Sequence, residues 1–310
     1  MNQSSNPDVI ENTLRRHDGL LEILLLDRTS STPTKPRNII WATESYNGHK
    51  PKDRIHIEDI TGDNSFLIQP RIAKSKEEQK ARTKDKAEVF TPKDVVDEMN
   101  KQADWCSGHW PVSDDNWQDY ILEKRLEITC GEAPFIVGRY NAANGKKVLK
   151  LSERVGFLDR KLQILAKYVD NKEEWLEWAF KAFKCSYGYE WQGDNLLLAR
   201  ENLLYTFIDY WNDKFQNDRI DLERKISKEK MSILIQVAEI ISWNIFQMDG
   251  INNIIPMSGV VDDKAPEIPP LLLLFGEKPP KPKGKRPIYV KVMNWEKNKT
   301  EKFKDIINKG

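Results

Sequence analysis

The residues whose types and spacing could support chemistry are concentrated in residues 126–136, Leu-Glu-Ile-Thr-Cys-Gly-Glu-Ala-Pro-Phe-Ile. A short extended run reaches an acid, Glu127, a tight Cys130-Gly131 turn follows, and apolar residues then resume. This order is typical of the first strand of a nucleotide-binding α/β domain. Small residues let the loop backbone approach a ligand, and an acid near the strand end binds one of its polar groups. Taken alone, the same residues also fit a simple turn that binds nothing.

Two further features lie in a matching order along the chain. Residues 90–92 (Phe-Thr-Pro) precede the turn, and residues 187–190 (Tyr-Gly-Tyr-Glu) follow it as a second strand with an acid at its tip. Residues 199–203 (Ala-Arg-Glu-Asn-Leu) then fall in an amphipathic run that predicts a long helix over 194–215. In a minimal unit the second acid comes about twenty residues after the loop. Glu190 lies much further on, so the interval must hold an insertion.

Together these segments resemble the amino-methylating DNA methyltransferases, which use S-adenosylmethionine (SAM) to methylate the exocyclic amine of adenine. In the subfamily with the cofactor half first, a Phe-Thr-Pro segment precedes an Asp-Pro-Ala-Cys-Gly-Ser-Gly-type loop. An acid then ends the second strand, and a helix carries Ala-Arg-x-Asn-Leu. The resemblance covers roughly residues 85–310. The chain departs from the pattern at Glu127 (commonly Asp), Ile128 (usually Pro) and Ala133 (usually Gly).

The resemblance implies a SAM site with a role for each acid. Glu127 takes the amino head of the cofactor, and Glu190 accepts both ribose hydroxyls. Asp249 accepts from the adenine amine, while Gly131 and Ala133 keep the loop close to the methionine portion. The full set of expected cofactor-binding residues is Phe90, Thr91, Pro92, Glu127, Thr129, Cys130, Gly131, Ala133, Phe135, Glu190, Trp191 and Asp249.

The family's catalytic tetrapeptide, Asn/Asp-Pro-Pro-Tyr/Phe, is missing from the sequence. Pro-Pro occurs only at 269–270 and 279–280, without the flanking Asn or Asp and without the aromatic residue. In related single-chain enzymes, a segment like residues 294–307 leads into the strand that carries the tetrapeptide. We therefore expect no catalytic residue in this chain. A second methyltransferase subunit is expected to supply the Asn-Pro-Pro-Tyr-type motif, the remaining strands and the DNA-reading domain, so that double-stranded DNA is bound by the complex.

Two other interpretations stay open at this point. The chain could be a non-catalytic SAM-binding scaffold or sensor subunit of a restriction or phage-defence complex. It could also be a complete methyltransferase with an atypical catalytic motif. If the sheet is completed by a partner, the isolated chain should expose an apolar surface around the strand ending at Asp249 and along the Pro-rich tail.

Composition sets limits on these functions. The 310 residues are 31% charged, yet the formal net charge is only +1, so DNA contact must come from local patches or from a partner. Residues 71–89 form one such basic run and read as an exposed helix. The three cysteines form no Cys-x-x-Cys pair, which argues against a disulfide framework or structural zinc, and we expect no metal site. The apolar runs are too short to span a bilayer and no secretory signal is present, so the sequence predicts a cytoplasmic protein without membrane contact.

The sequence predicts an α/β fold with a Rossmann-like SAM-dependent methyltransferase sheet that is incomplete in this chain. Residues 1–86 form an irregular N-terminal region of short strands and loops, ending in the basic helix. Residues 87–262 form the SAM-binding domain, with a helical insertion over 141–184, and residues 263–310 form a Pro-rich arm and a terminal hairpin that bind the partner. The predicted helices are 153–169, 194–215, 225–241 and one capped by Asn171, whose residues 175, 178, 179, 182 and 183 form one buried apolar stripe. Thr91 caps one more helix, in which Val95, Val96 and Met99 face the core. A strand-like apolar stretch ends in residues 242–250.

Overall fold

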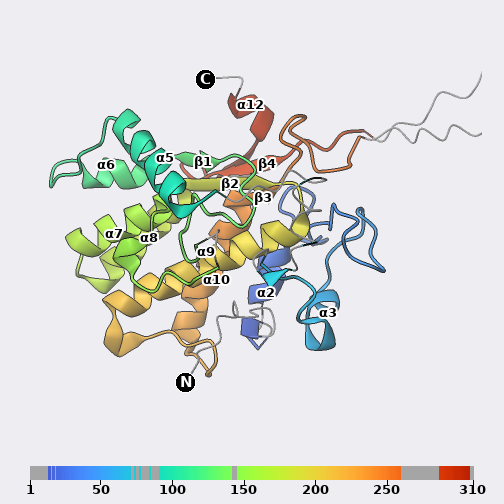
Figure 1. Ribbon diagram of the computed structural model, residues 1–310, viewed down its shortest axis with the longest axis horizontal. Helices are drawn as coiled ribbons and strands as arrows, with labels where there is room; N and C mark the ends of the chain where they lie inside the picture. The colour runs from blue at the N-terminus through green and yellow to red at the C-terminus, as the bar shows by residue number, and fades with distance from the viewer. Residues whose placement is uncertain are drawn as a thin grey trace, which may run out of the picture.

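The computed structural model of the protein describes residues 13, 14, 16, 17, 19–70, 73, 74, 77, 84, 91–141, 145–259 and 286–307. Its centre is a small parallel sheet with helices packed against it, so the predicted α/β class is confirmed at this level (Figure 1). Phe90, most of the basic run 71–89 and most of the Pro-rich arm lie outside the described residues. Of the helices in the described part of the chain, none has the length and apolarity needed to cross a membrane.

The sheet has three strands, β1 (Arg125–Glu127), β2 (Ser186–Glu190) and β3 (Ile245–Gln247), in the order β1-β2-β3. All are parallel, with Glu127 opposite Gly188 and Glu190 opposite Gln247. Both predicted acid-tipped strands are confirmed. The third strand is shorter than the sequence predicts, because the preceding helix continues through Asn244.

The interval between β1 and β2 is helical, as predicted, and holds α7 (Phe157–Tyr168) and α8 (Lys172–Lys184). Helix α7 begins later than expected because residues 151–153 form a separate 3₁₀ turn. A side chain at Gly156 would place its Cβ 2.3 Å from the Ile136 carbonyl oxygen, so only glycine lets α7 start against the loop after β1. The Asn171 side chain caps α8, accepting from Glu174 N at 2.9 Å as the sequence predicts. The predicted stripe on α8 is buried: Trp175, Trp178, Ala179, Ala182 and Phe183.

Two long helices connect β2 to β3, namely α9 (Gly193–Lys214) and α10 (Lys228–Asn244). Both correspond to predicted helices. Figure 1 shows them with α7 and α8 on one side of the sheet. Their apolar side chains form the main hydrophobic core, to which the sheet contributes Ile245.

The N-terminal region differs from the prediction of short strands. It contains two short helices, α2 (Leu20–Leu25) and α3 (Ile57–Ile60), whereas pairing is limited to isolated bridges such as Leu26 with Asn38. Leucines in α2 recur at helical spacing and pack against α10 in the main core, which explains the helix. The 3₁₀ turns of the described residues are η1 (Gly62–Asn64), η3 (Leu151–Glu153) and η4 (Gln216–Asp218).

Helix α5 (Lys93–Cys106) begins where the sequence places it, but its cap is different. Pro92 occupies the N-cap position and no side chain caps the helix, so the predicted Thr91 cap is wrong. Only part of the predicted apolar face is buried: Val96 is covered, whereas Met99 is 54% exposed. The short helix α6 (Trp117–Leu122) follows.

The second face of the sheet carries the C-terminal segment. Strands β4 (Lys291–Asn294) and β5 (Lys299–Lys302) form the predicted antiparallel hairpin, and α12 (Phe303–Ile307) follows. A second, smaller apolar cluster joins Tyr189 and Phe246 of the sheet to Val290 and Val292, with Phe303 packed on it. The two faces of the sheet are therefore covered very unequally.

Candidate functional site

The loop after β1 turns sharply across the end of β2. Thr129, Gly131 and Ala133 all have positive φ, at 52°, 54° and 66°. Such angles suit glycine and cost free energy at other residues, so surrounding contacts must hold the loop in place. Two of these contacts are backbone hydrogen bonds at 2.7 Å, from Cys130 N to Tyr189 O and from Ala133 N to Cys130 O.

Glu127, the last residue of β1, anchors the far end of this loop. Its carboxylate oxygens accept from Phe135 N at 3.3 Å and from Ile136 N at 3.1 Å. The side chain is buried, and burial raises its pKa well above the usual value although the two hydrogen bonds oppose this shift. Glu127 is therefore placed at the predicted site, where it shapes the loop.

Glu190, the last residue of β2, holds the near end of the same loop. One carboxylate oxygen accepts from Gly131 N at 2.9 Å and the other from Gln192 N at 3.0 Å. The side chain is only 7% exposed, and burial raises its pKa to about 7 despite these bonds. A carboxylate has about four acceptor positions. The Trp191 backbone also hydrogen-bonds this carboxylate, so about one acceptor position remains for a further donor such as a hydroxyl.

Cys130 lies between the two acids. Its thiol is buried, and desolvation first, then the charges of Glu127 and Glu190, raises its pKa well above the usual value. A thiol in this state is neutral and a poor nucleophile. Cys130 therefore fills space under the loop as a neutral thiol.

Gly188 and Asn202, for which the sequence predicts no individual role, also fix the loop. A side chain at Gly188 would bring its Cβ to 3.0 Å from Ile136 Cδ1 and 3.1 Å from Cys130 Cβ, so any larger residue would push the loop away from β2. Asn202, on α9, donates from Nδ2 to the Glu132 carbonyl at 3.1 Å. For Gly188 the sequence does offer a signal, because a glycine in the interior of a strand often marks a site where another backbone approaches closely.

The structure places Asp249 just beyond β3, at the same carboxyl edge of the sheet as Glu127 and Glu190. Its carboxylate accepts from Ile251 N at 3.0 Å and from Asn252 N at 3.1 Å, so it organises its own turn. Three acids from three neighbouring strands therefore end at one edge, where ligands of parallel α/β sheets bind.

The remaining predicted residues surround this edge to different degrees. Thr129 is exposed and Ala133 fully buried, while Phe135 is half-buried. Trp191 is 37% exposed and donates from Nε1 to the Ala42 carbonyl at 3.0 Å. Thr91 and Pro92 lie at the start of α5, and Asn100 of this helix donates to the Phe135 carbonyl at 3.0 Å. Helix α5 is thus tied directly to the candidate loop.

Fold and site together define a chain with a parallel α/β sheet and a carboxylate-lined loop at its carboxyl edge. Comparison with protein-family models gave no match, and comparisons with curated proteins and with solved structures gave no significant match. Within the described residues, no group of three or more His, Cys, Asp or Glu side chains is placed to hold a metal ion. The chemistry of the site therefore has to be argued from its own residues.

Proposed function

We propose that this chain is the SAM-binding subunit of an adenine-specific, amino-methylating DNA methyltransferase with a Rossmann-like sheet. A second polypeptide carries the Asn-Pro-Pro-Tyr-type tetrapeptide and the domain that reads DNA. The complex, with both subunits present, binds double-stranded DNA and transfers the methyl group.

One observation carries the proposal. Glu127 and Glu190 end adjacent parallel strands, both are buried, and both accept hydrogen bonds from the backbone of the same loop. This arrangement fixes two acceptor groups at the edge where a nucleoside-type ligand would lie. Beside its backbone bonds to Gly131, Gln192 and Trp191, Glu190 retains about one acceptor position for a ribose hydroxyl.

The charge of the site favours SAM over a dinucleotide. Pyrophosphate binding uses a helix N-terminus or a glycine-rich loop free of nearby negative charge. Here two buried carboxyl groups lie directly against the loop, and their ionised forms would repel phosphate. SAM has no phosphate and carries a sulfonium and an ammonium group, which the same carboxylates attract.

Calorimetric titration with SAM tests the proposal. Glu190→Gln should weaken binding about tenfold to a hundredfold, equivalent to about 1.5–3 kcal/mol, because an acceptor of the ribose hydroxyls becomes a donor. Asp159→Asn is the matched control. Asp159 is also a buried carboxyl group with a raised pKa, and it accepts from Gly138 N at 2.5 Å.

Equal losses in the two variants would show a structural effect and contradict a direct role for Glu190. Full affinity in Glu190→Gln would place the ribose acid elsewhere. NAD, used as a probe in the same titration, should show no binding.

A second function is favoured by the absence of the catalytic tetrapeptide from these 310 residues. The chain would then bind SAM as a non-catalytic scaffold or sensor subunit. The two functions separate when the co-purified complex is incubated with SAM labelled in its methyl group and adenine-containing DNA. Labelled adenine supports the methyltransferase, whereas SAM binding without label in DNA supports the sensor.

A further inference from the structure

Among the described residues, no strand pairs with the outer edge of β1. In the described part of the chain, β1 pairs only with β2, through bonds that include Arg125 N to Cys185 O at 3.1 Å. Because successive residues of a strand direct their backbone groups to opposite sides, the N–H and C=O of Leu126 point away from β2. Leu126 is 37% exposed, and Ile128 just beyond it is 66% exposed. An apolar, unpaired edge of this kind is a template for another strand.

The other edge of the sheet does not offer such a surface. Gln247 of β3 exchanges hydrogen bonds with Ile40, accepting from its N–H at 2.9 Å and donating to its carbonyl at 2.8 Å. All residues of β3 are buried. The expectation of an exposed apolar surface around the strand leading to Asp249 is therefore wrong for β3, because the N-terminal region covers it.

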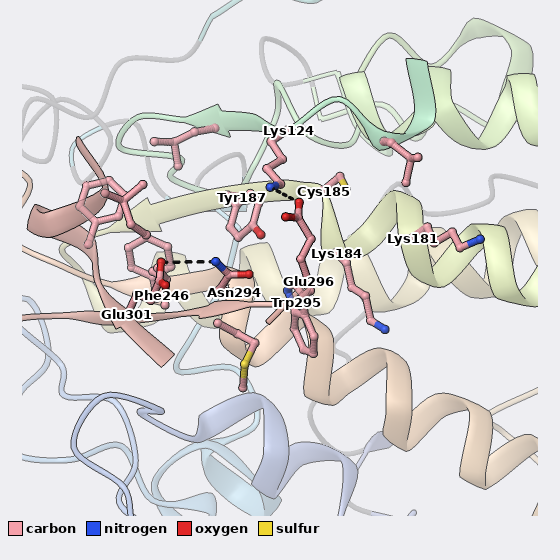
Figure 2. A pocket seen from close by; sticks show the side chains of 16 residues that line it. Lys124, Lys181, Lys184, Cys185, Tyr187, Phe246, Asn294, Trp295, Glu296 and Glu301 are labelled. Carbon is pink, nitrogen blue, oxygen red and sulfur yellow. Dashed lines mark hydrogen bonds and ion pairs between the residues drawn. The ribbon is translucent and has the colours of Figure 1, made fainter. Parts of the chain in front are cut away.

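An apolar cleft of about 560 Å³ continues from the open edge onto the second face of the sheet (Figure 2). Leu126 belongs to both the edge and the cleft. The cleft floor is formed by Tyr187 and Phe246, and its far wall by the hairpin and α12, including Trp295 and Ile306.

The handedness of parallel connections explains why the cleft lies on this face. The two connections, from β1 to β2 and from β2 to β3, move across the sheet in the same direction. Their helices pack on the face that bears Ile245. A β-α-β unit that continues the sheet outward from β1 advances in the opposite direction. With right-handed crossovers, its helix must lie on the opposite face. That face holds the cleft.

The charges around the cleft indicate which charged side chain such a helix would carry. Lys124 pairs with Glu296 at 2.5 Å across the opening, and Lys181 pairs with Glu177 at 2.7 Å. Lys184 lies over the Trp295 ring at 5.2 Å, and none of the described carboxylates pairs with it. A carboxylate from outside would complete this rim.

We propose that the outer edge of β1 binds a parallel β-strand of a partner polypeptide. The cleft binds the apolar face of a helix from the same β-α unit, with Asp or Glu facing Lys184. The inference deepens the proposed function and rests on it for the partner's identity, while its geometry comes from the sheet alone.

Photo-crosslinking in the cells that produce this protein tests the docking surface. Benzoylphenylalanine is placed at Ile128, at Ile306, or at the control position Leu149, which is 77% exposed and distant in sequence from the edge and the cleft. The first two positions should each link to one and the same polypeptide. The peptide linked to Ile128 should be an apolar strand, and that linked to Ile306 an acidic amphipathic helix next to it.

Matched variants of α12 sharpen the test. Ile306→Glu, with Ile306 lining the cleft, should reduce crosslinking from Ile128 roughly tenfold or more, as expected for loss of an interface anchor. Ile307→Glu places the same charge on the neighbouring residue, which does not line the cleft, and should leave crosslinking unchanged.

Four results would overturn the inference: no adduct from Ile128 and Ile306, adducts with a second copy of this chain, equal capture at Leu149, or equal effects of the two glutamates. Calorimetry with SAM on the same variants separates this failure from failure of the proposed function. SAM affinity that survives in Ile306→Glu with normal crosslinking would reject the docking surface and leave the cofactor site standing. Normal crosslinking in a complex that does not bind SAM would reject the cofactor site and leave the docking surface standing.

Discussion

At the scale of single residues, Glu190 has a structural task and, in the proposed function, a binding task. Its carboxylate holds the loop after β1 through Gly131 N and the start of α9 through Gln192 N, and it still has acceptor capacity left. Burial raises its pKa to about 7, so the group is close to half-ionised under ordinary conditions. Its ability to accept a ribose hydroxyl in the proposed complex therefore depends on pH.

SAM affinity should rise with pH across this range. Below pH 7 the protonated Glu190 offers a donor in place of one acceptor, so binding should weaken progressively between about pH 8 and pH 6. Calorimetric titrations at several pH values measure the slope. In Glu190→Gln only the ligand titrates, so SAM affinity should change less with pH than in the wild type. The same dependence on pH in both proteins would contradict a role for Glu190 in binding SAM.

The same shifts make a prediction for stability. Burial raises the folded-state pKa of Glu190 to about 7 and of Asp159 to about 6. The folded protein then binds more protons than the unfolded chain from about pH 4.5 upward, so the free energy of unfolding should fall as pH rises toward 7. Urea unfolding at pH 5 and pH 7 checks the sign. The double variant Glu190→Gln/Asp159→Asn should lose part of this fall, and an increase of stability with pH would contradict it.

At the scale of elements, the packing of the loop on β2 sets the geometry of the site. Gly188→Ala would introduce a Cβ at 3.0–3.1 Å from Ile136 and Cys130, which the loop must avoid by moving. We expect a loss of about 1–3 kcal/mol in the free energy of unfolding together with weaker SAM binding. Trimming Ile136 to Val removes the Cδ1 contact, so the double variant should recover part of both losses.

If Gly188→Ala unfolds with wild-type stability and binds SAM normally, the close approach of loop and strand does not matter for the site. Denaturant unfolding and calorimetry on the two single variants and the double variant give the complete cycle.

Several elements could be predicted because local signals fixed them. The acid at the tip of β2, the Asn171 cap and the tryptophan stripe of α8 each depend on residues close in the chain. Helix α2 was not predicted although its leucines recur at helical spacing, because the run is short and its burial depends on α10, far away in sequence. The role of Gly188 was missed for the same reason, since its meaning lies in the contact with Cys130. Long-range packing decides such features, and periodicity alone does not contain it.

At the scale of the whole molecule, the two sheet edges differ in a way that the sequence did not reveal. The N-terminal region covers β3, whereas the outer edge of β1, the strand that leads into the candidate loop, has no partner among the described residues. The candidate loop and the proposed docking edge therefore share one strand. In the proposed complex, a strand added beside β1 would lie next to bound SAM, where a target base must be presented.

The open edge should govern the behaviour of the isolated chain. Exposed Leu126 and Ile128 beside unpaired backbone groups favour edge-to-edge association, which natural sheets suppress with charged residues, especially lysine. Ile128→Lys should therefore shift the purified chain toward monomer in sedimentation velocity runs at increasing concentration. Leu149→Lys adds the same charge at another exposed leucine and should leave the self-association of the wild type unchanged. If both lysines reduce self-association equally, net charge is the cause. If neither lysine reduces it, or if the wild type is monomeric at every concentration, the β1 edge does not drive association.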